Sequence, residues 1–526
     1  MTAQFDYIIV GAGSAGCVLA NRLSASGRFR VLLLEAGPDD NRFFMRMPLG
    51  YGMCFYNPKI NWMYWSEPNE GLGGRSVYVP RGKVLGGSSS INAMVYIRGA
   101  REDYDDWERA GNRGWGWKDT GPAFEAIERE LQVSSSQRTA HGLCDFYFAA
   151  AQELGFPVNA DFNGESQTGV GYNPVSIRKG VRRSAAQVFL KPAMTWPNLT
   201  VMTGAQVMRI LFEGSRASGV AVKVNGADQT FSAGREIILS SGAIHTPQLL
   251  QVSGIGPADE LKAHGIAVRR DVPAVGANLA DHVAYDHYYT SRIPTLNQEL
   301  GPLFARAMTG LRYLLTHNGP FAGSMNQAGG FVKSRENLTR PNIQLYFCPS
   351  SYDRAPPKTR RMTQPDPFPG FGLTVSNCRP KSRGSVKIKS ASMTDAPAID
   401  LNLLSAKEDV DELVEGAHLM RRFAKTKALS QVIIEEFKPG PAKQSDADFR
   451  EDIRANAYSI FHPCGTCRMG TDDGSAVVDA RLKVHGVESL RIADASVFPT
   501  IPAGNINAPS MMVGQRAAEI ILAEQN

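Results

Sequence analysis

The first sixteen residues constrain the fold more than any other segment of the chain. Residues 5–10 have the apolar character of a buried strand, and the run Gly11-Ala-Gly13-Ser14-Ala15-Gly16 follows directly. Glycines at this spacing allow a tight turn from a strand into a helix whose first N–H groups face a bound phosphate. We therefore predict a βαβ unit that opens a Rossmann-like nucleotide-binding domain. The motif alone does not separate FAD from NAD.

A second buried strand is expected at residues 31–34, where Val-Leu-Leu-Leu precedes Glu35 and Ala36. Glu35 lies 24 positions after Gly11. A carboxylate near this distance from the glycine motif meets the ribose hydroxyls in dinucleotide-binding folds. The acidic residue therefore strengthens the prediction of a nucleotide site.

The remaining pattern predicts an α/β protein with two domains, as its length of 526 residues also favours. Residues 41–80 lack periodicity and indicate a long loop, while 102–132 have helical spacing. Strands are expected at 198–211, 219–224, 236–240, 343–348 and 372–377, and helices at 303–315, 407–426 and 509–524. We predict that 1–160, 190–295 and 460–526 form the nucleotide-binding domain, and that 161–189 and 296–459 form an inserted substrate domain of antiparallel sheet plus helices.

Two further glycine-rich segments carry possible binding chemistry. Residues 82–92 run Gly82-Lys-Val84-Leu-Gly-Gly87-Ser88-Ser-Ser-Ile91-Asn92, and they are framed by Pro80-Arg81 and by an apolar run. This framing is unusual for a flexible linker, and such a loop exposes N–H groups and hydroxyls that can embrace a pyrophosphate or a flavin ring. Residues 242–257 continue a buried strand into a helix begun by Thr-Pro.

The clearest candidate for proton transfer is His462, in Phe-His-Pro-Cys-Gly-Thr-Cys, with Asn505 43 positions later in Gly-Asn-Ile-Asn. An imidazole and a carboxamide on two loops can hold a hydroxyl group while its proton is removed. Two alternatives are weaker. Cys464 and Cys467 could form a dithiol, but a four-cysteine zinc site would need a second pair. His282 and His287 form a local cluster that could bind a metal, although isolated histidines are more often structural.

Composition excludes several classes of protein. The net charge of +6 is mild and no block of five basic residues occurs, so a nucleic-acid partner is not expected. No apolar run reaches 18 residues, which argues against a membrane span. The first strand leaves no room for a signal peptide, and seven scattered cysteines indicate reduced thiols. These features predict a cytoplasmic protein whose mild positive charge permits peripheral attachment to the inner membrane.

Four segments together resemble the glucose–methanol–choline (GMC) oxidoreductases: the Gly11 motif, the 82–92 loop, the 242–256 segment, and His462 with Gly504-Asn505. The branch that the chain resembles most contains choline dehydrogenases and bacterial FAD-dependent alcohol dehydrogenases, which share the motifs at 74–83 and 92–99. The resemblance implies bound FAD, oxidation of an alcohol to a carbonyl, His462 as general base and Asn505 as its partner on the alcohol oxygen. It also implies cofactor contacts from Gly11, Gly13, Ser14, Ala15, Gly16, Glu35, Ala36, Gly82, Val84, Gly87, Ser88, Asn92, Ala93, Val95, Val207, Asp494, Ala495 and Asn505.

Two departures from the family sharpen the expectation. Some members link FAD covalently through a histidine after the serine run, where this chain has Ile91, so FAD is expected to bind non-covalently. Members that oxidise choline carry a glutamate that corresponds here to Gln327, which would line the substrate pocket with Phe331 and Trp62. We therefore predict oxidation of an uncharged primary alcohol to the aldehyde, with a quinone-like acceptor or oxygen receiving the electrons and no metal.

Several alternatives stay open at this point. The chain could be a choline dehydrogenase or an alcohol oxidase that produces hydrogen peroxide. A flavoprotein that takes hydride from NAD(P)H would need a second complete glycine motif. A flavin fold that has lost its chemistry would be expected to lack His462 or Asn505, and a flavin enzyme of elimination or isomerisation would keep them.

Overall fold

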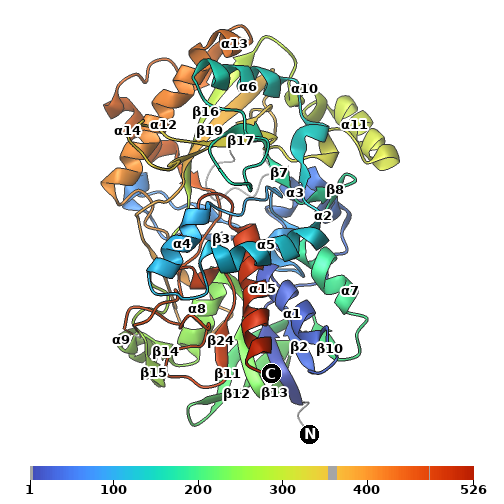
Figure 1. Ribbon diagram of the computed structural model, residues 1–526, viewed down its shortest axis with the longest axis vertical. Coiled ribbons are helices and arrows are strands. Elements are labelled where there is room, and N and C mark those ends of the chain that lie inside the picture. Colours follow the sequence, from blue (N-terminus) through green and yellow to red (C-terminus); the bar gives the residue numbers. More distant parts are fainter. Residues whose placement is uncertain (1–3, 353–363, 473, 526) are drawn as a thin grey trace.

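Two seven-stranded sheets lie at opposite ends of the long axis of the molecule (Figure 1). The computed structural model describes residues 4–352, 364–472 and 474–525. One sheet contains the strands of the N-terminal motif. The other belongs to the middle of the chain, and the two are linked by loops and short elements that enclose the site.

The first sheet has the order β10-β2-β1-β13-β12-β11, with β24 paired to β13. Its centre is parallel because β1 pairs with β2 and β13, and β24 joins β13 in the same direction. The first half of β13 instead forms an antiparallel meander with β12 and β11. The strands are β1 (Gln4–Val10), β2 (Val31–Leu34), β10 (Leu199–Met202), β11 (Ala205–Glu213), β12 (Arg216–Val224), β13 (Ala227–Leu239) and β24 (Leu490–Ile492).

The single strand predicted at 198–211 is wrong, because it is divided into β10 and β11. Gly204 lies at the break with φ +63, a left-handed conformation that glycine adopts at little cost. The chain turns there from the parallel edge into the antiparallel meander. The predicted helical region 102–132 likewise contains two helices, α4 (Arg101–Arg109) and α5 (Trp117–Leu131), separated by Gly111 and Gly114 at φ +98 and +85.

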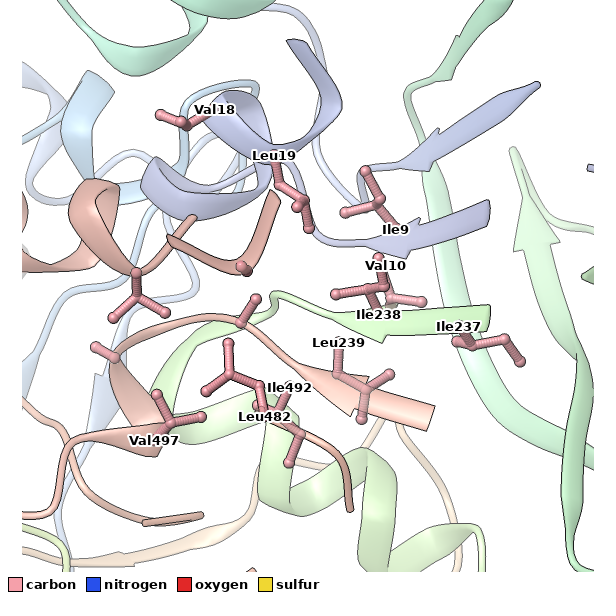
Figure 2. Packing of buried hydrophobic residues seen from close by; sticks show 14 of the residues in the cluster. Ile9, Val10, Val18, Leu19, Ile237, Ile238, Leu239, Leu482, Ile492 and Val497 are labelled. Atoms are coloured by element: carbon pink, nitrogen blue, oxygen red, sulfur yellow. The ribbon is translucent and has the colours of Figure 1, made fainter. Parts of the chain in front are cut away.

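Helices from both ends of the chain cover the first sheet. The helix α1 (Ser14–Ser24) follows β1, and α15 (Asn507–Ala523) packs beside it so closely that a Cβ on Gly514 would lie 2.4 Å from the Ala15 carbonyl oxygen. Figure 2 shows Leu19 of α1 facing Ile9 and Val10, and Leu239 of β13 near Ile492. This apolar core fixes the carboxyl ends of the parallel strands, where nucleotide sites form.

The second sheet is antiparallel throughout, in the order β22-β16-β19-β18-β17-β6, with β23 paired to β16. Strand β16 falls within the predicted nucleotide-binding segment 190–295, but its hydrogen-bonding partners are β19 and β22. That strand therefore belongs with the second sheet; the other proposed domain limits stay a prediction. The strands are β6 (Gly169–Tyr172), β16 (Val283–Ser291), β17 (Ala328–Val332), β18 (Ile343–Cys348), β19 (Gly370–Asn377), β22 (Ile433–Lys438) and β23 (Tyr458–Ser459).

Alternation along these strands separates a core face from a cavity face. Tyr285, Phe347 and Val375 point into a core with α12 (Lys407–Lys425), α6 (Leu143–Glu153) and α14 (Asp446–Asn456). Their neighbours in sequence point to the other face and line a large cavity, as Tyr346 and Thr374 do. The period of two therefore gives this sheet one packed face and one that can meet a ligand.

The predicted loop at 41–80 is largely irregular but holds short elements: α2 (Phe43–Arg46), α3 (Tyr51–Cys54), β3 (Tyr64–Trp65) and β4 (Tyr78–Val79). The helix expected at 303–315 is confirmed as α11 (Leu303–Thr316), which follows α10 (Leu296–Leu300). Within the described residues, no helix combines the length and apolar character that a membrane crossing requires. Other elements include α7 (Lys191–Ala193), α8 (Gly242–Val252), α9 (Ala258–Ala263) and α13 (Lys427–Ser430).

Candidate active site

A cavity of about 1240 Å³ is lined by residues from both sheets and from the 41–80 segment. It brings together most of the residues that the sequence singled out. On its wall lie Gly11, Gly13, Ser14, Ala15, Glu35, Ala36, Trp62, Gly82, Gly87, Ser88, Asn92, Ala93, Val95, Val207, His462, Asp494, Ala495 and Asn505. The cavity is therefore one continuous space that joins the glycine motif to the histidine and asparagine.

Two glycine loops form one end of the cavity by touching each other through their backbones. A Cβ on Gly11, at φ +103, would lie 2.6 Å from the Ser240 carbonyl oxygen, and a Cβ on Gly87 would lie 2.8 Å from the Gly13 Cα. The Gly86 N–H also donates to the Ala12 carbonyl at 2.7 Å. Side chains are excluded at these contacts, so the backbone itself forms the wall.

Gly16 and Val84 were predicted to meet the cofactor, but neither lines the cavity. A Cβ on Gly16 would lie 2.0 Å from the Gly11 carbonyl oxygen, so this glycine permits the close packing of α1 against its own turn. Val84 is fully buried in an apolar cluster with Met45 and Ile60. Both residues therefore support the cavity wall without facing the cavity.

Two helix N-termini open into the cavity. Gly13 precedes α1 and Ile506 precedes α15, and neither residue caps its helix with a side chain. The N–H groups of the first turn therefore remain available to an anion. Gly13, Ser14 and Ala15 line the cavity at one helix, and Asn507 and Ser510 do so at the other.

Glu35 lies at the carboxyl end of β2 with its carboxylate held by the backbone. The N–H groups of Ala12 and Gly37 donate to its two oxygens at 3.1 and 2.8 Å. Burial nevertheless raises the pKa of Glu35 to about 7, against the lowering effect of these hydrogen bonds. The side chain is thus fixed at the cavity wall, where it can accept a hydrogen bond from a hydroxyl group.

Asp494 ties three segments together at the cavity wall. One carboxylate oxygen accepts from the Gly242 N–H and the Thr246 hydroxyl at 2.8 and 2.7 Å, and the other accepts from the Ser496 N–H at 2.8 Å. Burial raises the pKa of this carboxyl group. The aspartate joins the end of β24 to the start of α8, which explains why the predicted 242–257 segment lies beside the site.

His462 links to a second histidine that the sequence did not assign to this site. Its Nδ1 lies 3.0 Å from Nδ1 of His282, and its Nε2 lies 3.2 Å from Nδ2 of Asn505. Nε2 of His282 lies 3.0 Å from the carbonyl oxygen of Cys378. A buried chain of four polar groups therefore ends at the cavity wall.

The chain has one consistent proton arrangement when both imidazoles are neutral. The Cys378 carbonyl can only accept, so His282 carries its proton on Nε2 and accepts at Nδ1. His462 must then donate from Nδ1, which leaves a lone pair on its Nε2. That lone pair faces the Asn505 amide and the cavity, the position that a general base requires.

Burial keeps both histidines neutral. It lowers the pKa of His282 to about 4. The pKa of His462 is lowered well below its usual value by burial first, and then by His282 and Arg81. Asp281 holds the backbone in place because its carboxylate accepts from the His462 N–H at 2.7 Å and from the Ser459 hydroxyl at 2.5 Å.

Asn505 is oriented by the second sheet. Gln344 of β18 donates from Nε2 to the Asn505 Oδ1 at 3.3 Å, so the amide presents its NH₂ group to His462. Tyr346, two residues along the same strand, lies beside Asn505 with its hydroxyl buried and without an ordinary hydrogen bond to any described residue. Burial raises the pKa of Tyr346, so the hydroxyl stays protonated and can donate.

Comparison with known proteins identifies the family to which the chain belongs. The N-terminal profile of the GMC oxidoreductases matches residues 5–284, and the C-terminal profile matches residues 380–514. The chain belongs to the GMC oxidoreductase family.

Relatives match over nearly the whole length. An alcohol dehydrogenase (acceptor) from Pseudomonas putida is 42% identical and is matched over 99% of this chain and 96% of its own. An oxygen-dependent choline dehydrogenase from Photobacterium profundum is 39% identical, with 99% and 94% covered. Among solved structures, pyridoxine 4-oxidase from Mesorbium loti has a TM-score of 0.88 at 29% identity, and a formate oxidase has 0.90 at 27%; coverage is 98% of both chains for the first and 99% of both for the second.

These comparisons establish the class of chemistry: this GMC oxidoreductase is an FAD-dependent oxidoreductase that acts on CH–OH donors. The observed cavity fits FAD on structural grounds. Backbone from two glycine loops excludes side chains, two uncapped helix N-termini face the space, and the Glu35 carboxylate lies at the end of β2. This donor set suits a pyrophosphate and a ribose.

The prediction that Gln327 of this GMC oxidoreductase contacts the substrate is contradicted by its surroundings. Its side chain accepts from the His141 N–H at 2.7 Å and donates to the Thr139 carbonyl at 3.2 Å, and it does not line the cavity. The amide is used to hold the 136–141 segment against β17. Phe331 is also behind the wall, where it packs with Ile97 and would lie 3.1 Å from a Cβ on Gly504.

The remaining histidine and cysteine motifs form no cluster suited to a metal among the described residues. His282 precedes β16 and contacts His462 and Cys378, whereas His287 lies within the strand and contacts Glu436. Cys464 and Cys467 are free and buried, and burial raises the pKa of both thiols. His245 lines the cavity and is hydrogen-bonded at 2.6 Å to the Tyr64 hydroxyl.

Proposed function

We propose that the enzyme oxidises a primary alcohol to the aldehyde, with His462 as general base and Asn505 as a donor to the alcohol oxygen. The observation that carries the proposal is the lone pair on the His462 Nε2, held toward the cavity by the chain through His282 to Cys378. A hydroxyl group placed between the two side chains would donate to the imidazole and accept from the amide. Bound FAD supplies the hydride acceptor.

The cofactor contacts are proposed from the cavity wall. Gly11, Gly13 and the first turn of α1 would hold the pyrophosphate, and Glu35 would accept from the adenosine ribose. All of Val207, Asn92, Ala93 and Val95 line the cavity. Val207 would meet the adenosine, and the other three would lie near the flavin. The start of α15 would face the flavin and favour negative charge on its ring.

We propose non-covalent attachment of FAD. Ile91 lies on the cavity wall and offers no nucleophile to the flavin. Acid precipitation of the purified protein should therefore leave all of the yellow colour in the supernatant. Colour that stays with the pellet would contradict the proposal.

The substrate is proposed to be uncharged. Among the described lining residues, Glu35 and Asp494 are the carboxylates, and both belong to the nucleotide end. Asp286 lies behind the substrate wall, where the hydroxyls of Thr374 and Tyr458 donate to it at 2.6 and 2.8 Å. A desolvated quaternary ammonium group needs an anion or an aromatic cage.

Choline is the second candidate because choline dehydrogenases are among the relatives at 39 to 40% identity. Aromatic rings on the substrate side also supply surfaces that attract a cation; they include Trp65, Tyr288, Tyr346, Tyr352, Tyr458 and Phe461. The two candidates differ in one property, the charge of the alcohol, and one panel of substrates separates them.

The deciding experiment is anaerobic reduction of the bound flavin by aliphatic and aromatic primary alcohols and by choline. Neutral alcohols should bleach the flavin absorbance faster, at equal concentration, than choline does. A preference for choline of tenfold or more, equivalent to about 1.4 kcal/mol of discrimination, would reverse the choice of substrate. Failure of every alcohol would contradict the proposed function itself.

The electron acceptor is proposed to be quinone-like, as in a cytoplasmic enzyme that attaches peripherally to the inner membrane. The acceptor-dependent alcohol dehydrogenase from Pseudomonas putida is the relative that supports this choice. Reoxidation of the reduced enzyme should be faster with a soluble quinone than with air. Hydrogen peroxide formation at the full turnover rate would favour oxygen instead.

A further inference from the structure

The outer surface of α11 is apolar where a helix of a soluble domain would normally be polar. Leu303, Phe304 and Leu315 are 77, 79 and 75% exposed, and Met308, Leu311 and Leu314 are about half exposed. Residues 304, 308, 311 and 315 follow the i, i+4, i+7, i+11 spacing of one helix face. The inward face is occupied by Thr309 and Tyr313, which are buried.

The short helix α2 extends this surface. Phe43 and Phe44 are 51 and 44% exposed, and the Phe43 ring lies 6.3 Å from that of Tyr313 in α11. We define the α2–α11 surface as Phe43, Phe44, Leu303, Phe304, Met308, Leu311, Leu314 and Leu315. It accounts for eight of the twelve large apolar side chains that are most exposed in the described chain, so the exposure is concentrated rather than scattered.

Positive charge surrounds the α2–α11 surface. Arg42 precedes α2, Arg46 is its last residue, and Arg306 and Arg312 lie on α11. Neither helix contains Asp or Glu in its sequence. Within the described residues none of these four arginines forms an ion pair with a carboxylate. The acidic residue nearest to α11 in sequence is Glu299 of α10, and it is partly buried. The charge is therefore free to meet an anionic partner.

The same surface adjoins the cavity. Phe44 is both exposed and part of the cavity wall, and Arg306, Leu300 and Phe321 line the cavity from the α10–α11 side. Met47, Tyr313 and Ala322 form the small apolar cluster that joins these elements. In Figure 1, α11 lies at the periphery of the molecule, with α2 on the same side.

We propose that the α2–α11 surface docks onto an anionic lipid bilayer, so that the cavity opens toward the membrane. Exposed Leu and Phe on one face of a helix, with arginine and no acidic residue, are what binding in the plane of a membrane interface requires. Apolar side chains enter the acyl boundary while arginines meet the anionic headgroups. The inference extends the proposed peripheral attachment to a named surface, and it does not depend on the identity of the alcohol.

The test is co-sedimentation of the FAD-loaded enzyme with vesicles of phosphatidylcholine alone and with vesicles that also contain phosphatidylglycerol. The wild type should bind the mixed vesicles and bind the neutral ones more weakly. Phe304→Asp with Leu311→Asp should abolish binding, and Arg42→Gln, Arg46→Gln and Arg312→Gln should each weaken it about fivefold, the value of roughly 1 kcal/mol per basic residue. Added salt should weaken binding to the mixed vesicles.

The matched control is Met194→Asp with Ile434→Asp, which places two charges at exposed apolar residues outside this surface. The control should bind vesicles as the wild type does. Both double variants should reduce a soluble acceptor at the wild-type rate, which shows that folding and chemistry are intact. Loss of that activity together with vesicle binding would instead indicate misfolding, and single Leu315→Ser would then replace the double variant.

Two outcomes would overturn the proposal. The wild type could fail to bind the mixed vesicles, or Phe304→Asp with Leu311→Asp could bind as tightly as the wild type. If the wild type fails to bind and light scattering shows an oligomer that this double variant dissociates, the surface would be an interface between copies of the chain. Because vesicle binding is measured without substrate, failure here leaves the proposed alcohol oxidation separately testable.

Discussion

The two ends of the cavity are built by different means. At the nucleotide end, backbone approaches backbone, and Gly11 and Gly87 are needed because no Cβ fits at their contacts. At the substrate end, the wall consists of side chains from alternate positions of antiparallel strands, together with His462 and Asn505. The first end is a rigid surface for binding, and the second presents functional groups.

This difference predicts how each end responds to substitution. A larger residue at Gly11 or Gly87 should prevent cofactor binding or destabilise the fold, because a close-packed backbone can shift only at a high cost in free energy. A change at the substrate end should leave the cofactor bound and alter the rate of its reduction. The following substitutions test that separation.

The largest effect is expected for Gly11→Ala. The new Cβ would lie 2.6 Å from the Ser240 carbonyl oxygen, and alanine would also have to adopt φ +103. We expect loss of bound FAD, measured as the ratio of flavin to protein absorbance, with a lower melting temperature. Gly27→Ala is the control, since Gly27 has φ +70 but no atom within 4 Å of its Cβ position. Equal flavin retention by both variants would contradict the conclusion that FAD binding requires glycine at position 11.

His462→Ala should have the next largest effect, and it should affect chemistry alone. Loss of a positioned general base slows a reaction by roughly a hundredfold or more. FAD content should stay at the wild-type level, and stopped-flow reduction by the alcohol should show the decrease. Asn505→Ala should slow reduction less because the base remains. A wild-type rate for His462→Ala would disprove its assignment and direct attention to His245, which also lines the cavity.

The low pKa of His462 predicts an unusual pH profile. Because burial, His282 and Arg81 lower this pKa, the imidazole stays unprotonated as the pH falls below the ordinary histidine value of about 6.5. The acid limb of kcat/KM should therefore lie below that pH. An acid limb above pH 6.5, of about 7.5 for example, would contradict a neutral base held in this environment.

His282→Ala should move that limb to higher pH, because the space left by the ring admits water and relieves the burial that lowers the pKa of His462. It should also slow reduction about tenfold through loss of the fixed tautomer. His282→Asn supplies an oxygen that can accept from the His462 Nδ1–H and should restore most of the rate. A rate loss in both variants with an unchanged pH profile would indicate a purely structural role for His282.

Sequence reasoning identified the nucleotide end well because its determinants are local. Gly11, Gly13 and Glu35 lie within one βαβ unit, where spacing along the chain determines position in space. It failed for Gln327, because the side chain's partners, His141 and Thr139, lie more than 180 positions away. His282 was noted only as a possible metal ligand. Its contact with His462 spans 180 residues and depends on where β16 enters the second sheet.

Gln344 and Tyr346 were not assigned to the site for the same reason. Their role follows from alternation on β18 and from the pairing of that strand with β17 and β19. The strand Ile343–Cys348 alternates between apolar core residues and a face with Gln344 and Tyr346, but this alternation does not reveal what that second face meets. The fold class could therefore be predicted, and His462 lies on the cavity wall, whereas the substrate wall required the sheet register.

The smallest effect tests one hydroxyl of that wall. Tyr346→Phe removes a buried hydroxyl that lies beside Asn505 without an ordinary hydrogen bond to the described residues. If the hydroxyl serves the substrate, kcat/KM should fall about threefold to tenfold, the effect of losing one hydrogen bond worth about 0.5–1.5 kcal/mol. The melting temperature should stay the same or rise, because a poorly satisfied buried polar group has been removed.

Tyr7→Phe is the control: its hydroxyl is equally buried and unbonded but lies in the core of the first sheet, away from the cavity. Both variants should fold and keep a melting temperature at or above that of the wild type. Only Tyr346→Phe should lose activity. Wild-type kcat/KM for Tyr346→Phe across the alcohol panel would show that this hydroxyl does not contact the substrate.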